Sequence, residues 1–272
     1  MCGISGLANW GDAETLARMT HVQSHRGPDD SGLWERRFPD GGSIGLGSRR
    51  LAILDLSPDG HMPMSNEDGS VWITYNGEIY NFAELRRELE GKGHRFRSHT
   101  DTEAVVHLYE EYGVDCLNRL NGMFAFAICD LRGSAPKLFL ARDHFGVKPL
   151  YYCERDGKLA FASEVKALLE VPGSDVNAVN EADFTALHGS AFRGLDEVIQ
   201  ILVERGAHIN ARDFRGRTPY RLAEGSKQSF QFQAYPKTAE FMKKLGANTL
   251  LGVPGTVQER NRDVAAAAAN AK

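Results

Sequence analysis

The sequence predicts an α+β fold for residues 1 to about 170, followed by a short all-α segment. In the first part, β-rich runs alternate with amphipathic helical patterns and are separated by turn residues such as Asp68-Gly69 and Asp156-Gly157. Hairpins interleaved with helices favour layered α+β packing over a parallel sheet of βαβ units. After Leu169 a helical repeat replaces this pattern. A chain of 272 residues can hold one large or two modest domains.

The strand predictions rest on short alternating or β-rich runs. They are Ser43–Ser48, Leu51–Leu54, Val71–Tyr75, Phe124–Asp130, Lys137–Ala141, Leu150–Cys153 and Leu159–Ala162. Two helices are predicted between them. Asn81 to Glu84 has the pattern of a capping box and opens a helix that stops at Gly91. A second helix runs from Thr102 to Tyr112 and stops at Gly113.

The composition is that of an ordinary globular protein, with 42% hydrophobic and 25% charged residues. The formal charge of −4 gives no electrostatic reason to expect nucleic acid or an anionic membrane as partner. No apolar run approaches the ~20 residues of a membrane span, and the first residues lack a secretion signal. Cys116, Cys129 and Cys153 are expected to be reduced core thiols. The cytoplasm is therefore the expected location.

Cys2 is the first candidate for chemistry, because its neighbour Met1 is expected to be removed. Cys2 would then carry a free α-amino group with a pKa of ~8, beside a thiol with a pKa near ~8.5. The amino group can take the proton of the thiol, so nucleophile and base belong to one residue. No metal site is expected. His21 and His25 are spaced as ligands on a helix face, but the nearby Pro28 favours a structural role.

A carbonyl attacked by this thiol needs an oxyanion hole. Asn76 and Gly77, directly after a predicted strand, can supply a side-chain amide and a backbone N–H. A simple Asn-Gly turn is the alternative. An amino-acid substrate also needs its charged ends held. Arg50 can bind a carboxylate in bidentate fashion and Asp101 can pair with an ammonium group, although each also fits a plain structural role.

Eight sequence blocks occur in order along residues 1 to about 169. They are Cys2-Gly3-Ile4, His25 to Asp29, Arg50 to Asp55, Tyr75 to Asn81, Asp101-Thr102-Glu103, Leu120 to Ala127, Arg142 to Tyr152 and Phe161 to Leu168. Together they resemble the glutaminase domain of glutamine-dependent asparagine synthetases. That domain is a class II glutamine amidotransferase with an N-terminal nucleophile.

The resemblance implies a four-layer αββα fold and hydrolysis of L-glutamine to glutamate and ammonia through a thioester at Cys2. The implied oxyanion hole is Asn76 and Gly77. The implied substrate-binding residues are Arg50, Leu51, Ile53, Leu54, Asn76, Gly77, Glu78 and Asp101. Arg50 would bind the carboxylate of glutamine, and Glu78 and Asp101 its amino end. The His25–Asp29 and Arg142–Tyr152 blocks are expected to support the site without reacting.

Asparagine synthetases also have a second domain that binds ATP and Mg²⁺, and its Ser-Gly-Gly-Leu-Asp-Ser signature does not occur here. No cofactor is therefore expected in this chain, which by itself should not make asparagine. Residues 171–176 form the predicted linker. Residues 177–248 resemble about two ankyrin repeats, with Thr185 and Thr218 as helix caps. Residues 249–272 are expected to be a disordered tail.

Three functions remain open on the sequence. The first is an active glutaminase, the amidotransferase half of an asparagine synthetase-like system, with a separate synthetase as ammonia acceptor. The second is a non-catalytic glutamine-sensing or scaffolding module that binds proteins through its ankyrin-like surface. The third is an unproductive fusion product, because at least three repeats are usually needed for a stable array.

Overall fold

The structure is a computed structural model that describes residues 1–225 and 234–252. The chain divides into two compact units, Met1–Ser174 and Asp175–Lys272. The tail predicted at 249–272 lies, from residue 253 onward, outside the described residues. Across the described part of the chain, every helix is too short or too polar to span a bilayer.

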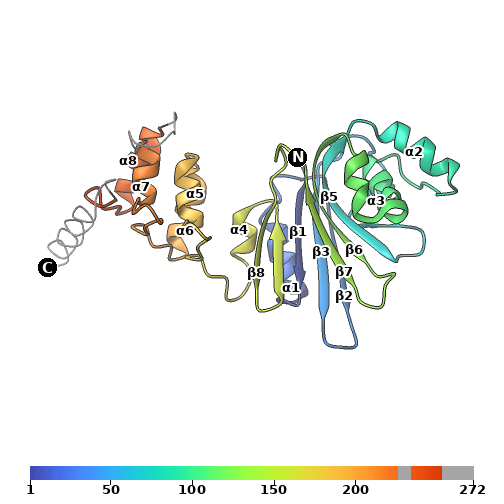
Figure 1. Ribbon diagram of the computed structural model, residues 1–272, viewed down its shortest axis with the longest axis horizontal. Helices are drawn as coiled ribbons and strands as arrows, with labels where there is room; N and C mark the ends of the chain where they lie inside the picture. The colour runs from blue at the N-terminus through green and yellow to red at the C-terminus, as the bar shows by residue number, and fades with distance from the viewer. Residues whose placement is uncertain (226–233, 253–272) are drawn as a thin grey trace. The chain divides into compact units, whose positions relative to one another are not determined.

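Two antiparallel sheets form the centre of the first unit (Figure 1). The strand order of the larger sheet is β2 (Asp30–Arg37), β3 (Ser43–Arg50), β1 (Gly3–Ala8), β9 (Lys158–Ala162) and β8 (Tyr151–Arg155). The order of the smaller sheet is β4 (Met64–Ser65), β5 (Val71–Ile79), β6 (Gly122–Asp130) and β7 (Lys137–Arg142). All these pairings are antiparallel, so the layered α+β prediction is confirmed and a βαβ sheet is excluded for this unit.

Helices cover the outer faces of both sheets. On the larger sheet these are α1 (Ala13–His21) and α4 (Val165–Leu168). On the smaller sheet α3 (Asp101–Tyr112) packs against β5, with α2 (Phe82–Gly91) beside it. Two short 3₁₀ helices are η1 (Pro58–Gly60) and η2 (Gly113–Arg119). Separate apolar clusters lie under each helical layer and between the sheets, which gives the expected order helix, sheet, sheet, helix.

The layer between the sheets is packed from large side chains on one side and small ones on the other. Ile4 and Phe161 of the larger sheet face Ala125 and Ala127 of β6, and all four are fully buried. A Cβ atom added to Gly6 would lie 2.2 Å from the Phe161 ring. Glycine at this position therefore lets the aromatic ring lie flat on β1.

Several elements have no clear sequence signal. β1 is a central strand whose residues Gly3 to Leu7 are all buried, so it shows no polar alternation. α1 begins at an Asp12 cap, whose Oδ1 accepts the Thr15 N–H at 2.9 Å. The predicted capping box at Asn81 is wrong. Asn81 precedes α2, but its side chain instead accepts the Asn121 N–H at 3.0 Å and contacts the chain beyond α3.

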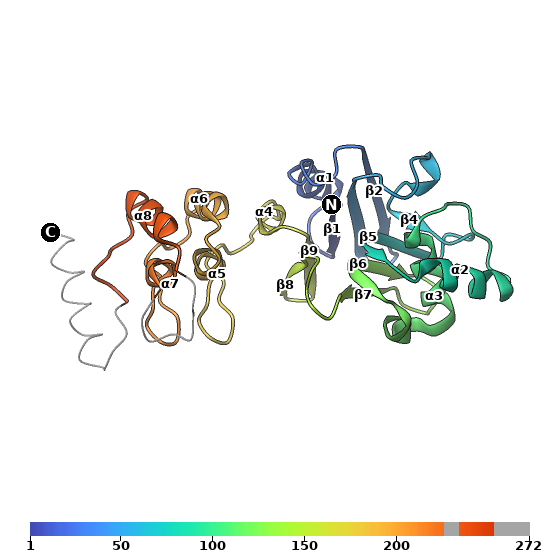
Figure 2. The same ribbon diagram turned by 90° about the horizontal axis from the view of Figure 1, so that it is seen from above.

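Within residues 175–225 and 234–252, the second unit forms two helical pairs (Figure 2). They are α5 (Ala186–Phe192) with α6 (Asp196–Glu204), and α7 (Pro219–Glu224) with α8 (Pro236–Lys244). Thr185 and Thr218 cap α5 and α7 as predicted. His188 Nε2 lies 3.0 Å from the Arg217 carbonyl and so connects the two pairs. Most of the insertion around residues 226–235 lies outside the described residues.

We expect Phe161→Ala to lower the unfolding free energy of the first unit by about 3–5 kcal/mol, because the ring is fully buried between rigid sheets. The measurement is urea denaturation of the whole chain. Phe145→Ala is the matched control, since this ring is 94% exposed and its loss should change stability by less than about 0.5 kcal/mol. Equal losses in the two variants would contradict the packing described.

Candidate active site

A cavity of about 260 Å³ opens beside Cys2. The nine residues that the sequence singles out all line it: Cys2, Arg50, Leu51, Ile53, Leu54, Asn76, Gly77, Glu78 and Asp101. They come from the start of β1, the end of β3 and the loop after it, the end of β5 and the start of α3. The remaining lining residues have no role predicted from the sequence: Met1, Gly60, Met62, Tyr75, Thr100, Thr102, Met123 and Lys148.

Cys2 lies directly before β1 and is partly buried. Its Sγ accepts the Leu51 N–H at 3.4 Å, and its carbonyl accepts Arg26 Nε at 2.9 Å. Burial raises the pKa of the Cys2 thiol, although the Leu51 hydrogen bond, the N-terminal ammonium group and Arg50 oppose this effect. The thiol is therefore uncharged at neutral pH and needs a base before it can act as a nucleophile.

The block His25–Asp29 contacts the main chain of Cys2. Arg26, which binds the Cys2 carbonyl, also donates to Glu164 at 3.1 Å. His25 Nε2 lies 2.9 Å from the same carboxylate. The spacing of His21 and His25 on one helix does not occur, because α1 ends at His21. This block thus has the supporting position that the sequence analysis expected.

Asn76 presents a donor without a partner. The residue is 1% exposed, and within the described part of the chain its Nδ2 finds no hydrogen-bond acceptor. A buried, unsatisfied amide costs ~1–3 kcal/mol, so such an atom indicates a place where a ligand supplies the acceptor. Asn76 lies within β5, which continues to Ile79 beyond the predicted strand end at Tyr75, so the alternative of a simple Asn-Gly turn does not occur.

The backbone of Gly77 faces the same space. Two residues further, the Ile79 N–H donates to Asp101 Oδ2 at 2.8 Å, on the side of β5 away from β6. Alternate residues of a strand direct their N–H groups to the same side, so the Gly77 N–H also points to this edge. A Cβ at Gly77 would lie 2.6 Å from Tyr75 Oη and 2.7 Å from the Met123 carbonyl, which requires glycine.

Two acids line one part of the cavity. Asp101 is 5% exposed, and its Oδ2 accepts Tyr75 Oη at 2.5 Å. Burial raises the pKa of Asp101 despite these hydrogen bonds. Burial also raises the pKa of Glu78, and the neighbouring Asp101 adds to the effect while Lys148 opposes it. The close pair of carboxylates is suited to a cationic group of a ligand.

Arg50 supplies positive charge to the cavity. It is 7% exposed, and its guanidinium donates to the main-chain carbonyls of Asp55 and of Ser57. A Cβ at Gly60 would lie 2.0 Å from Arg50 Nη2, so this glycine makes room for the guanidinium. Carbonyl acceptors orient the group without neutralising its charge, which leaves it available to an anionic ligand.

The segment from Leu51 to Ser57 is a loop, so the strand predicted at Leu51–Leu54 is wrong. Hydrogen bonds to side chains stabilise this loop, which among the described residues has no backbone pairing with a neighbouring strand. Asp55 accepts the N–H groups of Ser57 and of His99, each at 2.8 Å, and is 7% exposed. Hydrogen bonds from Ser57 and then from His99 lower the pKa of Asp55 to about 2. Ile53, on the cavity wall, remains 66% exposed.

Lys148 is the charged cavity residue that the sequence analysis did not assign. It is 5% exposed and follows a loop organised by Asp143. That carboxylate accepts backbone N–H groups from four residues: Phe124, Phe145, Val147 and Lys148. Burial opposes ionisation, but these donors outweigh it and lower the pKa of Asp143. The only sequence signal was the Arg142–Tyr152 block, which was expected to support the site.

A family profile described as "Glutamine amidotransferase domain" matches residues 1–204. Glutamine-hydrolyzing asparagine synthetase 3 of Bacillus subtilis is 37% identical over 215 residues, covering 73% of this chain and 33% of the relative. Glutamine-hydrolyzing asparagine synthetase 1 of the same bacterium is 41% identical over 189 residues, covering 67% and 28%. The chain therefore spans a third or less of the length of these relatives.

Among solved structures, glutamine phosphoribosylpyrophosphate amidotransferase from B. subtilis is similar with a TM-score of 0.49 and 22% identity, covering 61% of this chain and 43% of that chain.

We expect Asp55→Asn to flatten the acid dependence of stability. The pKa of Asp55 is about 2 in the folded state and 3.8 without its partners. Its contribution is complete above the unfolded value and is lost as the pH falls through the folded value, because the unfolded chain then binds more protons. Urea unfolding from neutral pH down to about pH 3 measures this slope. Asp59→Asn, an exposed carboxylate nearby, is the control; identical slopes for wild type and Asp55→Asn would contradict the assignment.

Proposed function

This chain belongs to the glutamine amidotransferase domain family, and on that basis we propose that its first unit hydrolyses L-glutamine to glutamate and ammonia with Cys2 as the nucleophile. The observation that carries the proposal is the buried Asn76 Nδ2, which has no acceptor among the described residues and lines the same cavity as Cys2. An amide donor kept unsatisfied beside a thiol is suited to a developing oxyanion.

The proposed reaction begins after removal of Met1, which itself lines the cavity. The α-amino group of Cys2 accepts the thiol proton, and Sγ attacks the carboxamide carbon of glutamine. The oxyanion receives hydrogen bonds from Asn76 Nδ2 and the Gly77 N–H. The protonated amino group then donates to the leaving nitrogen, which departs as ammonia. Water attacks the thioester, releases glutamate and restores the thiol.

The charges of the cavity give the substrate one orientation. Arg50 binds the α-carboxylate of glutamine, whereas Glu78 and Asp101 bind its α-ammonium group. Leu51, Ile53 and Leu54 lie along the substrate, on the loop that also carries the N–H bonded to Cys2 Sγ. Lys148 lowers the pKa of Glu78 and so favours its carboxylate form, while the positive charge of the lysine offsets part of the negative charge of the two acids.

We propose that the ammonia passes to an asparagine synthetase-type acceptor, because the relatives described above are named glutamine-hydrolyzing asparagine synthetases. In this proposal the first unit performs the glutaminase half-reaction, and an ATP-dependent synthetase uses the ammonia to complete asparagine synthesis. The competing function is a glutamine sensor that binds the amino acid without turning it over. Calorimetric binding of glutamine without ammonia release would favour the sensor.

For the second unit we propose an ankyrin-like, protein-binding role. The observation that favours it is a hydrogen bond repeated in both helical pairs. Asn177 Oδ1 accepts the His208 N–H at 2.7 Å, and Asn210 Oδ1 accepts the Asn248 N–H at 2.8 Å. A side-chain bond recurring at equivalent positions is typical of stacked structural repeats.

Removal of the nucleophile is the first test. We expect Cys2→Ala to abolish ammonia release from glutamine, because no other group in the cavity can form the thioester. Cys153→Ala is the matched control, as Cys153 is a half-buried cysteine on β8 outside the cavity lining. Ammonia is measured by a coupled dehydrogenase assay on the full chain, with mass spectrometry to establish that Met1 is removed. Equal rates for wild type and Cys2→Ala would refute the glutaminase.

Two cavity variants separate catalysis from binding. We expect Asn76→Ala to lower kcat by about 100–1,000-fold, since it removes an oxyanion donor. Asp101→Asn should chiefly raise KM, because this carboxylate holds the substrate in ground and transition states alike. Steady-state ammonia release over a range of glutamine concentrations gives both constants. An unchanged kcat in folded Asn76→Ala would exclude Asn76 from the oxyanion hole.

A further inference from the structure

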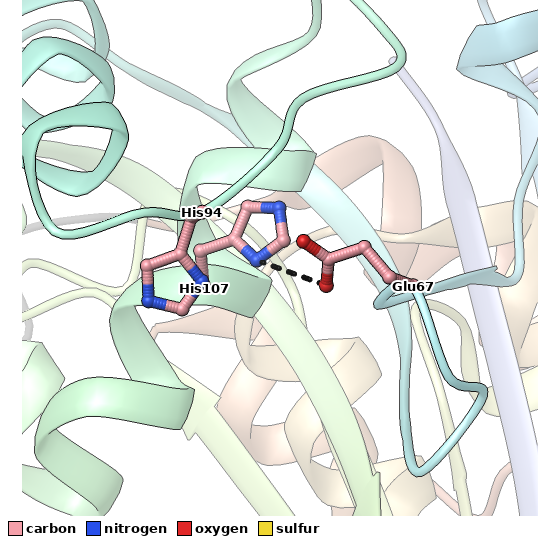
Figure 3. Close-up of side chains that lie close together, drawn as sticks. All are labelled: Glu67, His94 and His107. Carbon is pink, nitrogen blue, oxygen red and sulfur yellow. Dashed lines mark ion pairs between the residues drawn. The ribbon is translucent and has the colours of Figure 1, made fainter.

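A second group of chemically reactive side chains lies away from the Cys2 cavity. Glu67 follows β4, His94 follows α2, and His107 is in the middle of α3 (Figure 3). One ligand atom from each residue lies within 4.8 Å of the others. The two imidazole rings are tilted against each other, with centroids 4.7 Å apart. Three elements thus bring two imidazoles and a carboxylate to one point.

Glu110, one turn after His107 on α3, adds a fourth donor atom, a second carboxylate oxygen. Its Oε2 lies 2.8 Å from His107 Nδ1 and 3.7 Å from His94 Nδ1. The Nδ1 atoms of both histidines therefore face the same carboxylate oxygen, and His107 Nδ1 is also 4.0 Å from Glu67 Oε2. Two imidazole nitrogens and two carboxylate oxygens are a donor set that Zn²⁺ accepts in tetrahedral geometry.

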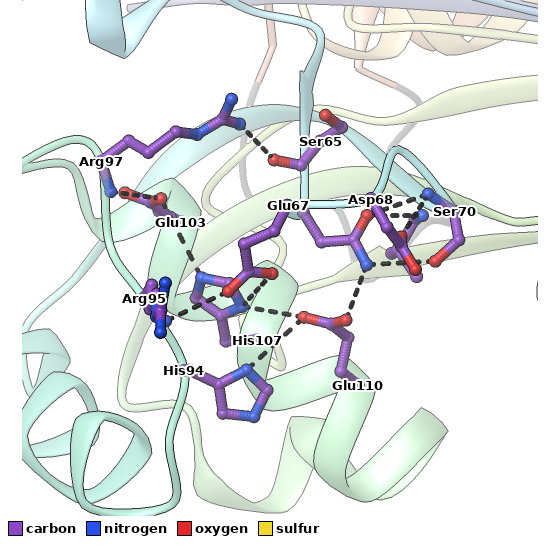
Figure 4. A network of polar contacts seen from close by, with 12 residues as sticks. Ser65, Glu67, Asp68, Ser70, His94, Arg95, Arg97, Glu103, His107 and Glu110 are labelled. Atoms are coloured by element: carbon purple, nitrogen blue, oxygen red, sulfur yellow. Dashed lines mark hydrogen bonds and ion pairs between the residues drawn. The ribbon is translucent and has the colours of Figure 1, made fainter.

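The surroundings orient these groups from outside (Figure 4). The other nitrogen of His94, Nε2, lies 3.0 Å from Glu111 Oε1. Glu67 accepts the Arg95 N–H at 3.1 Å, and the second oxygen of Glu110 accepts Asn66 Nδ2 at 2.7 Å. Metal-binding histidines commonly donate their distal N–H to a carboxylate, and carboxylate ligands are hydrogen-bonded in turn.

His107 provides an independent observation. The residue is 1% exposed, and among the described residues its Nε2 has no hydrogen-bond partner. The nearest acid is Glu103, whose Oε1 is 3.9 Å from that nitrogen. If Nδ1 binds a cation, Nε2 carries the proton and faces this carboxylate. At 3.9 Å this contact is electrostatic and is not a hydrogen bond, unlike the 3.0 Å contact of His94 with Glu111.

Charge also favours a cation at this point. Four carboxylates surround the two imidazoles: Glu67, Glu103, Glu110 and Glu111. Lys92 pairs with Glu111 at 2.8 Å, and Arg132 interacts with Glu110. The four carboxylates outnumber these two side-chain cations, and a divalent ion would balance the excess.

We propose that Glu67, His94, His107 and Glu110 form a structural site for Zn²⁺. The donor atoms would move until each lies about 2.0–2.2 Å from the ion. Rotation of Glu67, whose side chain is 42% exposed, would supply most of this movement. The ion would connect α3 to the segments before and after α2. Because α3 begins at Asp101, the same ion would brace one wall of the Cys2 cavity.

The test is a titration of the full chain, stripped by a chelator and dialysed, with ZnCl₂ in a calorimeter. We expect one site per chain in the wild type and an increase in Tm on loading. His94→Ala and Glu67→Gln should each weaken binding by about 10-fold or more. Two controls should bind as wild type: His61→Ala, a half-exposed histidine paired with Asp30, and Cys2→Ala, which removes the cavity thiol.

Cobalt provides a second readout that does not depend on stability. Co²⁺ in place of Zn²⁺ should give the visible absorption of a four-coordinate site, absent from His94→Ala. Absence of saturable Zn²⁺ binding would overturn the proposal, and the cluster would then be a network of hydrogen bonds and ion pairs. Equal affinity in wild type and in folded His94→Ala and Glu67→Gln would overturn it too, since the ion would then bind elsewhere.

Discussion

The close packing of the two sheets is the constraint on which the site of the first unit depends. β1 and β3 of one sheet lie against β5 of the other. Gly6 and the alanines of β6 keep this layer thin enough for Phe161 to fill it. As a result, Cys2 at the start of β1, Arg50 at the end of β3 and Asn76 near the end of β5 open onto one cavity.

Carboxylates that accept main-chain N–H groups hold the loops around that cavity. Asp55 joins the loop after β3 to the segment before α3, Asp101 joins α3 to β5, and Asp143 organises the loop that carries Lys148. A buried carboxylate is tolerated only where several donors replace its lost hydration. Each of these acids therefore specifies the conformation of a segment beside the cavity.

Sequence patterns predicted some elements of the first unit and missed others. β5, β6 and β7 were recognisable from their β-rich composition and α3 from its helical period, although β6 and α3 are buried over most of their length. β1 escaped notice because it is buried on both faces and rich in glycine. Leu51–Leu54 has strand-like composition, yet the Asp55 hydrogen bonds make it a loop. Asn81 has the spacing of a capping residue, but its side chain instead accepts a hydrogen bond from the N–H of Asn121, which is distant in the sequence.

The eight blocks, in their order along the chain, were enough to indicate the family and to name nine residues that line the cavity. They are recognisable in the sequence because catalytic and binding side chains must be of particular types. The tertiary structure decided which residues far apart in the sequence come into contact. It left the Asn76 amide without an acceptor, brought Lys148 beside Glu78, and gathered Glu67, His94 and His107 from three separate elements. Such contacts join residues far apart in the chain, and no local pattern encodes them. They arise only when the layers pack.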